Sequence, residues 1–78
     1  MRGREPRMGL ILKAIGSTDG KGLSKSALLG WCIRELKLSG QSSRDYLKDA
    51  MLAAYLEERD GSLFLTPDGK DFIADARA

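Results

Sequence analysis

Two short runs of residues with strand character flank the tripeptide Arg59-Asp60-Gly61, and this signal constrains the fold of the 78-residue chain more than any other. The runs are Tyr55-Leu56-Glu57-Glu58 and Ser62-Leu63-Phe64-Leu65. An Asp-Gly pair favours the tight turn whose twist matches that of two antiparallel strands. The apolar residues elsewhere recur at helical spacing. The sequence therefore predicts a mainly α fold with a small two-stranded β-hairpin.

Four segments have the pattern of amphipathic helices, with start signals before most of them. Pro6 opens the first helix, because the N–H that proline lacks would be unpaired in a first turn. Ser24 and Ser42 are good N-caps for the second and third helices, and Asp45 completes a variant of the capping box. Thr66-Pro67-Asp68 supplies a cap, a first residue and an acidic first turn for the last helix. The expected helices span about residues 6–16, 25–37, 43–54 and 67–77.

The chain is long enough for one domain, which we place at residues 8–78. Residues 1–7 form a basic N-terminal arm with Arg2, Arg4 and Arg7. This arm either lies along a groove of a polyanionic partner or is a disordered tail. Residues 1–48 carry ten Lys or Arg and four acids, whereas residues 49–78 carry three and seven. This asymmetry indicates one surface that faces a polyanion and another that faces solvent or a partner, although both halves also fit ordinary solvated surfaces.

Composition argues against several classes of protein. The single cysteine, Cys32, cannot form an internal disulfide, which fits a reducing, cytoplasmic setting. The chain has no histidine, the commonest general base and a common zinc ligand, and residues 16–22 lack the Gly-Lys-Ser/Thr ending of a phosphate-binding loop. No apolar run reaches the ~18–20 residues of a membrane span. We expect no enzyme activity, no cofactor, no metal and no membrane partner.

The segment from the third helix to the last helix resembles the winged helix-turn-helix family of small bacterial and archaeal DNA-binding regulators. The resemblance lies in Ala54-Tyr55-Leu56-Glu57 and in residues 59–73, with Leu65-Thr66-Pro67-Asp68-Gly69 as the most specific part. It extends over about residues 8–74 and implies a three-helix core, a wing at about residues 55–66 and a C-terminal helix. The family often has glycine where the third helix meets the wing. Here Ala54 holds that position, which suits alanine only where the backbone avoids positive φ.

The resemblance implies a transcriptional regulator, and we expect a homodimer that binds double-stranded DNA with the third helix in the major groove. Arginine and glutamine suit base edges, and serine and lysine suit phosphates. Alternatively, Ser42 only caps the helix and Arg44 and Lys48 are solvated, with Lys48 pairing with Asp45 or Asp49. The candidate DNA-binding residues are Gln41, Ser42, Ser43, Arg44, Lys48, Lys25, Lys21, Lys37 and Arg59.

Two features favour a protein partner instead. Glu57, Glu58 and Asp60 make the expected wing acidic around Arg59, so a wing deep in the minor groove is not expected. Trp31 lies off the apolar stripe of the second helix, so either the N-terminal arm covers it or it anchors an interface. The alternative function is therefore a protein–protein interaction module of a transcription, replication or defence complex, using Trp31 or the acidic C-terminal half. An RNA-binding or architectural role lacks an aromatic platform with basic flanks.

Overall fold

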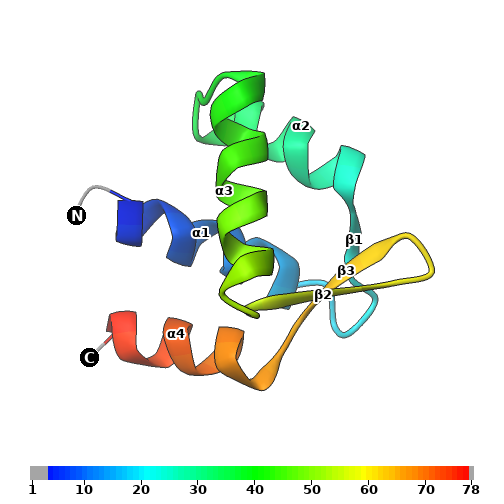
Figure 1. Ribbon diagram of the computed structural model, residues 1–78, viewed down its shortest axis with the longest axis vertical. Coiled ribbons are helices and arrows are strands. Elements are labelled where there is room, and N and C mark those ends of the chain that lie inside the picture. Colours follow the sequence, from blue (N-terminus) through cyan, green and yellow to red (C-terminus); the bar gives the residue numbers. More distant parts are fainter. Residues whose placement is uncertain (1–3, 78) are drawn as a thin grey trace.

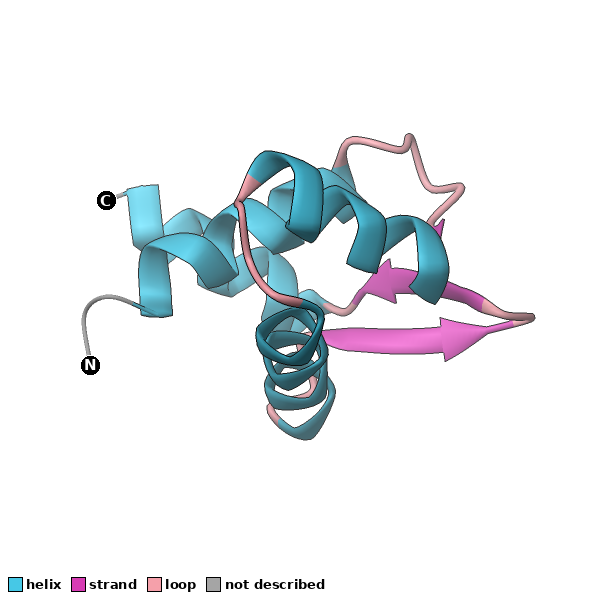
Figure 2. Ribbon diagram, turned by 90° about the horizontal axis from the view of Figure 1, so that it is seen from above, coloured by secondary structure: helices cyan, strands magenta, loops and turns pink. Residues whose placement is uncertain are grey.

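Four helices and a small antiparallel sheet make up the computed structural model, which describes the backbone of residues 4–77 and the side chains of residues 6–75 (Figure 1). The hairpin projects from one side of the molecule, and the start of α1 and the end of α4 lie on the other (Figures 1 and 2). The elements in chain order are α1 (Arg4–Gly16), β1 (Leu23–Ser24), α2 (Lys25–Glu35), α3 (Gly40–Leu52), β2 (Leu56–Arg59), β3 (Ser62–Leu65) and α4 (Pro67–Arg77).

The mainly helical prediction is confirmed, but the sheet has three strands in the order β1-β3-β2 rather than two. The extra strand β1 pairs with β3 through Leu23 opposite Leu63 and Ser24 opposite Ser62. Gly22, at φ +75°, allows this approach, because a Cβ there would lie 2.6 Å from the Leu63 carbonyl oxygen. Two residues are too few to show the alternating pattern of a strand, so the sequence contained no sign of β1.

The core lies where α1 packs against β3, α2 and α4. Its members repeat at three and four residues along the helices and alternate in β3, as expected for elements that bury one face. The hydrophobic side chains buried almost completely are Ile11, Leu12, Ile15, Leu28, Cys32, Ala50 and Leu63. Trp31 is half-buried and packs against this core, so other residues of the domain partly cover it.

The first helix begins at Arg4, two residues before Pro6, so residues 4–7 of the expected arm are helical. Proline fits there, because the first four N–H groups of a helix have no intrahelical partner. The Arg7 side chain is exposed, and Arg2 lies outside the described residues. At the end of α2, Lys37 has a φ of 58°, and the helix stops at Glu35 rather than near residue 37.

The prediction that Ser42 caps α3 is wrong. Ser39 is the N-cap, and its hydroxyl accepts a hydrogen bond of 3.0 Å from the Ser42 N–H. The predicted capping box is absent as well, because Asp45 accepts instead from the Gln41 side chain. Two serines three residues apart satisfy the same local preference. Gly40 occupies the first helical position. The cap of α2 is Ser24 as predicted, with its hydroxyl accepting from the Ala27 N–H.

Ala54, two residues after the end of α3, has a left-handed backbone with a φ of 62°. The Tyr55 N–H donates to the Ala50 carbonyl at 2.9 Å, and the Ala54 N–H donates to the Met51 carbonyl at 3.1 Å. These two bonds form the Schellman motif that usually carries glycine at this position. The expectation that alanine requires this backbone to avoid positive φ is therefore contradicted. Left-handed backbone costs a non-glycine residue roughly 1–2 kcal/mol, which other contacts must offset.

Those contacts come from the segment that starts α4. The Thr66 hydroxyl donates to the Ala54 carbonyl, and the Thr66 N–H donates to the Tyr55 carbonyl at 3.1 Å. The same hydroxyl accepts from the Gly69 N–H, so Thr66 caps α4 as predicted. Gly69 is buried, and a Cβ there would overlap the Tyr55 carbonyl oxygen. The Thr-Pro-Asp-Gly sequence thus fixes α4 against the end of α3.

Candidate functional site

The charged side chains on the exposed side of α3 form one basic row and one acidic row, because residues four positions apart lie on the same face of a helix. Arg44 and Lys48 form one row, and Asp45 and Asp49 form the next; all four side chains are exposed. Neither cation forms an ion pair with a side chain that the structure describes, so the suggested pairing of Lys48 with an aspartate is not observed. The outer surface of α3 therefore has a basic flank and an acidic flank.

The first turn of α3 holds Arg44 through neighbouring polar side chains. Gln41 Nε2 donates to Asp45 Oδ1 at 3.0 Å, and Arg44 Nη2 donates to Gln41 Oε1 at 3.4 Å. The second bond is at the long end of the hydrogen-bonding range, so it orients the guanidinium only weakly. The Gln41 amide uses one of its two N–H donors and its carbonyl oxygen, and Arg44 keeps donors for an outside partner.

Ser43 is not part of this surface, although the sequence placed it there. Its side chain is 1 % exposed, and its hydroxyl donates to the Ser39 carbonyl at 2.9 Å. Ser43 also hydrogen-bonds Cys32; burial raises the pKa of the Cys32 thiol, and this bond lowers it by less. The spacing of Ser43, Tyr46 and Ala50 was the signal for this buried face, but it was overlooked because the helix was expected to begin later. Ser42 lies at the helix start, half-buried.

The three lysines around α2 are not equivalent. Lys25, the first residue of α2, pairs with Glu58 of the hairpin at 3.2 Å, so part of its charge is already neutralised. Lys21 is exposed in the loop before β1, and Lys37 is exposed in the connection between α2 and α3. Among the described side chains, Lys21 and Lys37 therefore form no ion pair, whereas Lys25 forms one.

The strand register separates the charges of the hairpin onto two faces. Glu57 lies opposite Phe64, so Glu57, Phe64 and Arg59 share one face, whereas Glu58 shares the other face with buried Leu63. On the first face, the Arg59 guanidinium lies 4.2 Å from the centre of the Phe64 ring, and its Nε is 3.6 Å from Glu57 Oε1. The structure therefore does not bring Arg59 to the face that Lys25 reaches.

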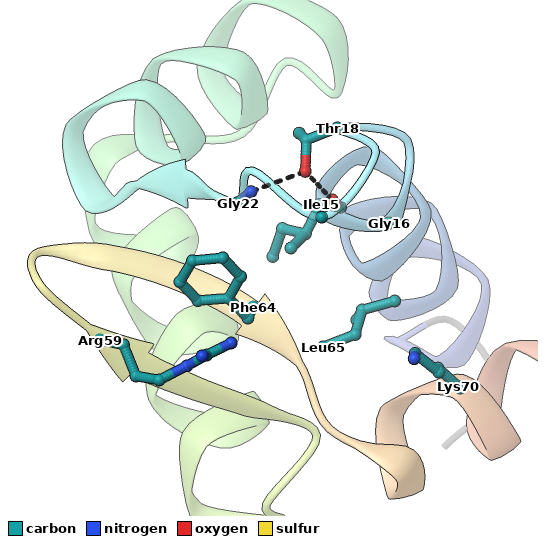
Figure 3. A pocket seen from close by; sticks show the side chains of 9 residues that line it. Ile15, Gly16, Thr18, Gly22, Arg59, Phe64, Leu65 and Lys70 are labelled. Carbon is teal, nitrogen blue, oxygen red and sulfur yellow. Dashed lines mark hydrogen bonds between the residues drawn. The ribbon is translucent and has the colours of Figure 1, made fainter.

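On the face that it shares with Phe64, Arg59 lines a hollow of about 430 Å³ between the end of α1, the hairpin and α4 (Figure 3). Lys70, on the first turn of α4, is a second cation at the hollow. Lys70 was not among the predicted site residues, because nothing local indicates that α4 lies beside the loop that follows α1. The lining residues are Ile15, Gly16, Thr18, Gly20, Gly22, Arg59, Phe64, Leu65 and Lys70.

Two further features are absent from the described residues. No helix there has the length and apolarity to cross a membrane. The same residues contain no cluster of three or more His, Cys, Asp or Glu side chains that could hold a metal ion. In comparisons with known proteins, the chain matches no protein-family model, no curated protein and no solved structure.

Proposed function

We propose that the chain is a winged helix-turn-helix domain that binds double-stranded DNA. In this proposal α2 and α3 are the helix-turn-helix, α3 enters the major groove, and the β2–β3 hairpin is the wing. The observation that carries the proposal is the row of Arg44 and Lys48, exposed on the outer side of α3 and free of ion pairs among the described side chains. The order of the elements supports it, with three helices, a hairpin and a last helix.

Each residue of this surface has a chemistry that suits DNA. The Arg44 guanidinium is suited to a bidentate contact with guanine, and Gln41 can contact an adjacent base once its present bonds open. Lys48 suits a phosphate, and the N–H groups at the start of α3 add a second phosphate site. Lys21 and Lys37 lie outside α3 and supply further contacts to the backbone of the duplex.

The acidic groups restrict how the duplex lies on this surface. Asp45 and Asp49 repel phosphates, so the groove must follow the basic flank of α3 and leave the acidic flank outside. The hairpin is acidic around Arg59, and Glu58 already pairs with Lys25. The wing therefore contributes little to affinity in this proposal, and α3 supplies most of the contacts. A homodimer on two half-sites about one helical turn apart would provide the specificity that a regulator needs.

The direct test is titration of the purified chain with labelled random-sequence duplexes at two salt concentrations. Binding through several cations predicts affinity that falls steeply as salt rises. The double variant Arg44→Ala/Lys48→Ala should weaken binding by about tenfold or more, since each lost phosphate or base contact contributes ~1 kcal/mol or more. Lys13→Ala is the control, because Lys13 is exposed on α1, which is not one of the two helices proposed to form the helix-turn-helix.

Two results would refute this proposal. One is an absence of duplex binding at low salt, where the electrostatic attraction is strongest. The other is a loss of binding free energy per removed charge that is the same in the Lys13 control and in the α3 double variant, which would mean that only the overall charge matters.

One observation favours a second candidate function, a protein–protein interaction module in a transcription, replication or defence complex. Leu52, at the end of α3, is 76 % exposed, more than the other exposed large apolar side chains, Leu10 at 45 % and Ile33 at 46 %. Half-burial of Trp31 makes that residue a weaker anchor than the sequence indicated. In this second function, the chain would bind duplexes negligibly, and Leu52→Ser would abolish capture of its partner.

A further inference from the structure

The hollow beside Arg59 and Lys70 combines positive charge with an apolar wall. Its two charged lining residues are both cations, one from β2 and one from α4 (Figure 3). Lys70 has no ion pair among the described side chains, while Arg59 is 3.6 Å from Glu57, which does not line the hollow. The space therefore has a positive potential that an anion would neutralise.

The uncharged side chains that line the hollow are either apolar or already hydrogen-bonded within the protein. Ile15, Phe64 and Leu65 supply hydrocarbon surface. The Thr18 hydroxyl donates to the Ile15 carbonyl and accepts from the Gly22 N–H, both at 2.8 Å (Figure 3). This hydroxyl has used its donor, so the hydrogen-bonding side chains left for a bound molecule are the two cations.

Three glycines that line the hollow affect its shape and the access to it. A Cβ at Gly22 would lie 2.8 Å from the Phe64 ring, and a Cβ at Gly16 would lie 2.9 Å from Leu65. At Gly20, by contrast, a Cβ would meet nothing within 4 Å, so this side of the hollow is open. A small molecule can therefore enter past the loop without displacing the hairpin.

We propose that this hollow binds a small organic anion with an apolar body, such as a carboxylate carried on a ring or a short hydrocarbon. The anionic group would lie between Arg59 and Lys70, and the body would lie against Phe64, Leu65 and Ile15. A volume of about 430 Å³ is in the range of small-molecule sites, which are mostly apolar with a few placed polar groups.

The hollow shares no lining residue with the surface proposed to bind DNA, although Lys21 of that surface lies between the lining residues Gly20 and Gly22. Its lining residues come from α1, the loop after it, β2, β3 and α4, and none comes from α2 or α3. The inference therefore does not rest on DNA binding, and each can fail alone.

The test is a titration of the ¹⁵N-labelled chain, followed by the amide signals of Gly20, Gly22 and Phe64. Four probes separate charge from apolar contact: phenylacetate, its neutral isostere phenylacetamide, acetate and inorganic phosphate. We expect phenylacetate to shift these signals with saturation. Phenylacetamide and acetate should each bind about tenfold more weakly, because each lacks one of the two contributions. Equal binding of phenylacetate and phenylacetamide, or of phenylacetate and phosphate, would overturn the proposal.

Variants locate the anion. Lys70→Gln should lower the affinity for phenylacetate by about threefold to fivefold, as expected for an exposed charge pair. Glu57→Gln should raise the same affinity by roughly twofold, because the substitution removes a carboxylate that competes for Arg59. Lys13→Gln is the matched control and should leave the affinity unchanged. No saturable shift, or the same loss in Lys13→Gln as in Lys70→Gln, would show that there is no site in the hollow.

Discussion

The two ends of α3 are held in different ways. At the first turn, Gln41, Arg44 and Asp45 hydrogen-bond one another along the helix and remain exposed. At the last turn, contacts come from a distant part of the chain: Thr66 donates to the carbonyls of Ala54 and Tyr55. One end is therefore positioned by its own side chains, and the other by tertiary structure.

This difference separates stability from recognition within one helix. Contacts with the hairpin and the start of α4 fix where α3 points, at a cost in backbone strain at Ala54. The exposed side chains of the first turn contribute little to that fixation, so Gln41, Arg44 and Asp45 can change with small effects on folding, unlike the buried Ser43. Substitutions at the end of α3 should change the free energy of unfolding, and substitutions at its start should change binding.

The largest effect is expected for Gly69→Ala. The new Cβ would overlap the Tyr55 carbonyl oxygen, and relief requires α4 to move away from the end of α3. We expect the free energy of unfolding to fall by about 3 kcal/mol, measured by urea denaturation. Asp71→Ala, at an exposed position of the same helix, is the control and should change it by less than about 0.5 kcal/mol. A loss below 1 kcal/mol for Gly69→Ala would mean that this contact does not hold α3.

The next effect concerns the first turn, and it rests on the proposed DNA binding. Arg44→Lys keeps the charge but loses the planar guanidinium that contacts guanine at two atoms. On a duplex selected from a random library, we expect about a tenfold loss of affinity, while affinity for random duplexes stays within about twofold. Electrophoretic mobility shift at fixed salt would measure both, and the urea midpoint should not move. Equal losses on both duplexes would assign Arg44 to a phosphate instead.

The sequence predicted those features of the fold that depend only on residues close together in the chain. The Asp60-Gly61 turn, the Ser24 cap and the Thr66 cap each depend on residues within a few positions, and all three were identified. The start of α3 was misplaced because Ser39 and Ser42 carry equivalent signals, and their tertiary surroundings decide between them.

Features that join distant segments left no sign in the sequence. The pairing of β1 with β3 brings Leu23 to Leu63, and the hollow brings Lys70 to the loop after α1. The positive φ of Ala54 is also imposed from a distance, through Thr66. The exposure of Arg44 and Lys48, in contrast, followed from helical spacing alone.

A gain in stability is expected for Ala54→Gly, at the fixed end of α3. Glycine adopts a φ of 62° without the steric cost that alanine pays, although it also gains entropy in the unfolded chain. The net change should raise the free energy of unfolding by about 0.5–1 kcal/mol in urea denaturation. Ala53→Gly is the matched control and should be destabilising, because Ala53, the C-cap of α3, has a negative φ of −81° that alanine adopts without steric cost. If Ala54→Gly destabilised the chain, the left-handed end of α3 would not exist in solution.

The smallest effect is expected for Glu58→Gln, on the side of the hairpin that reaches α2. The Lys25–Glu58 pair is exposed, so its loss should lower the free energy of unfolding by less than about 0.5 kcal/mol. Under the proposed DNA binding, the same change frees Lys25 and removes one carboxylate, so affinity for random duplexes should rise by roughly twofold to threefold at low salt. Glu57→Gln also removes one carboxylate, but from the face that Lys25 does not reach. An equal gain in both variants would attribute the effect to net charge, whereas a gain confined to Glu58→Gln would assign Lys25 to the DNA-facing side of the molecule.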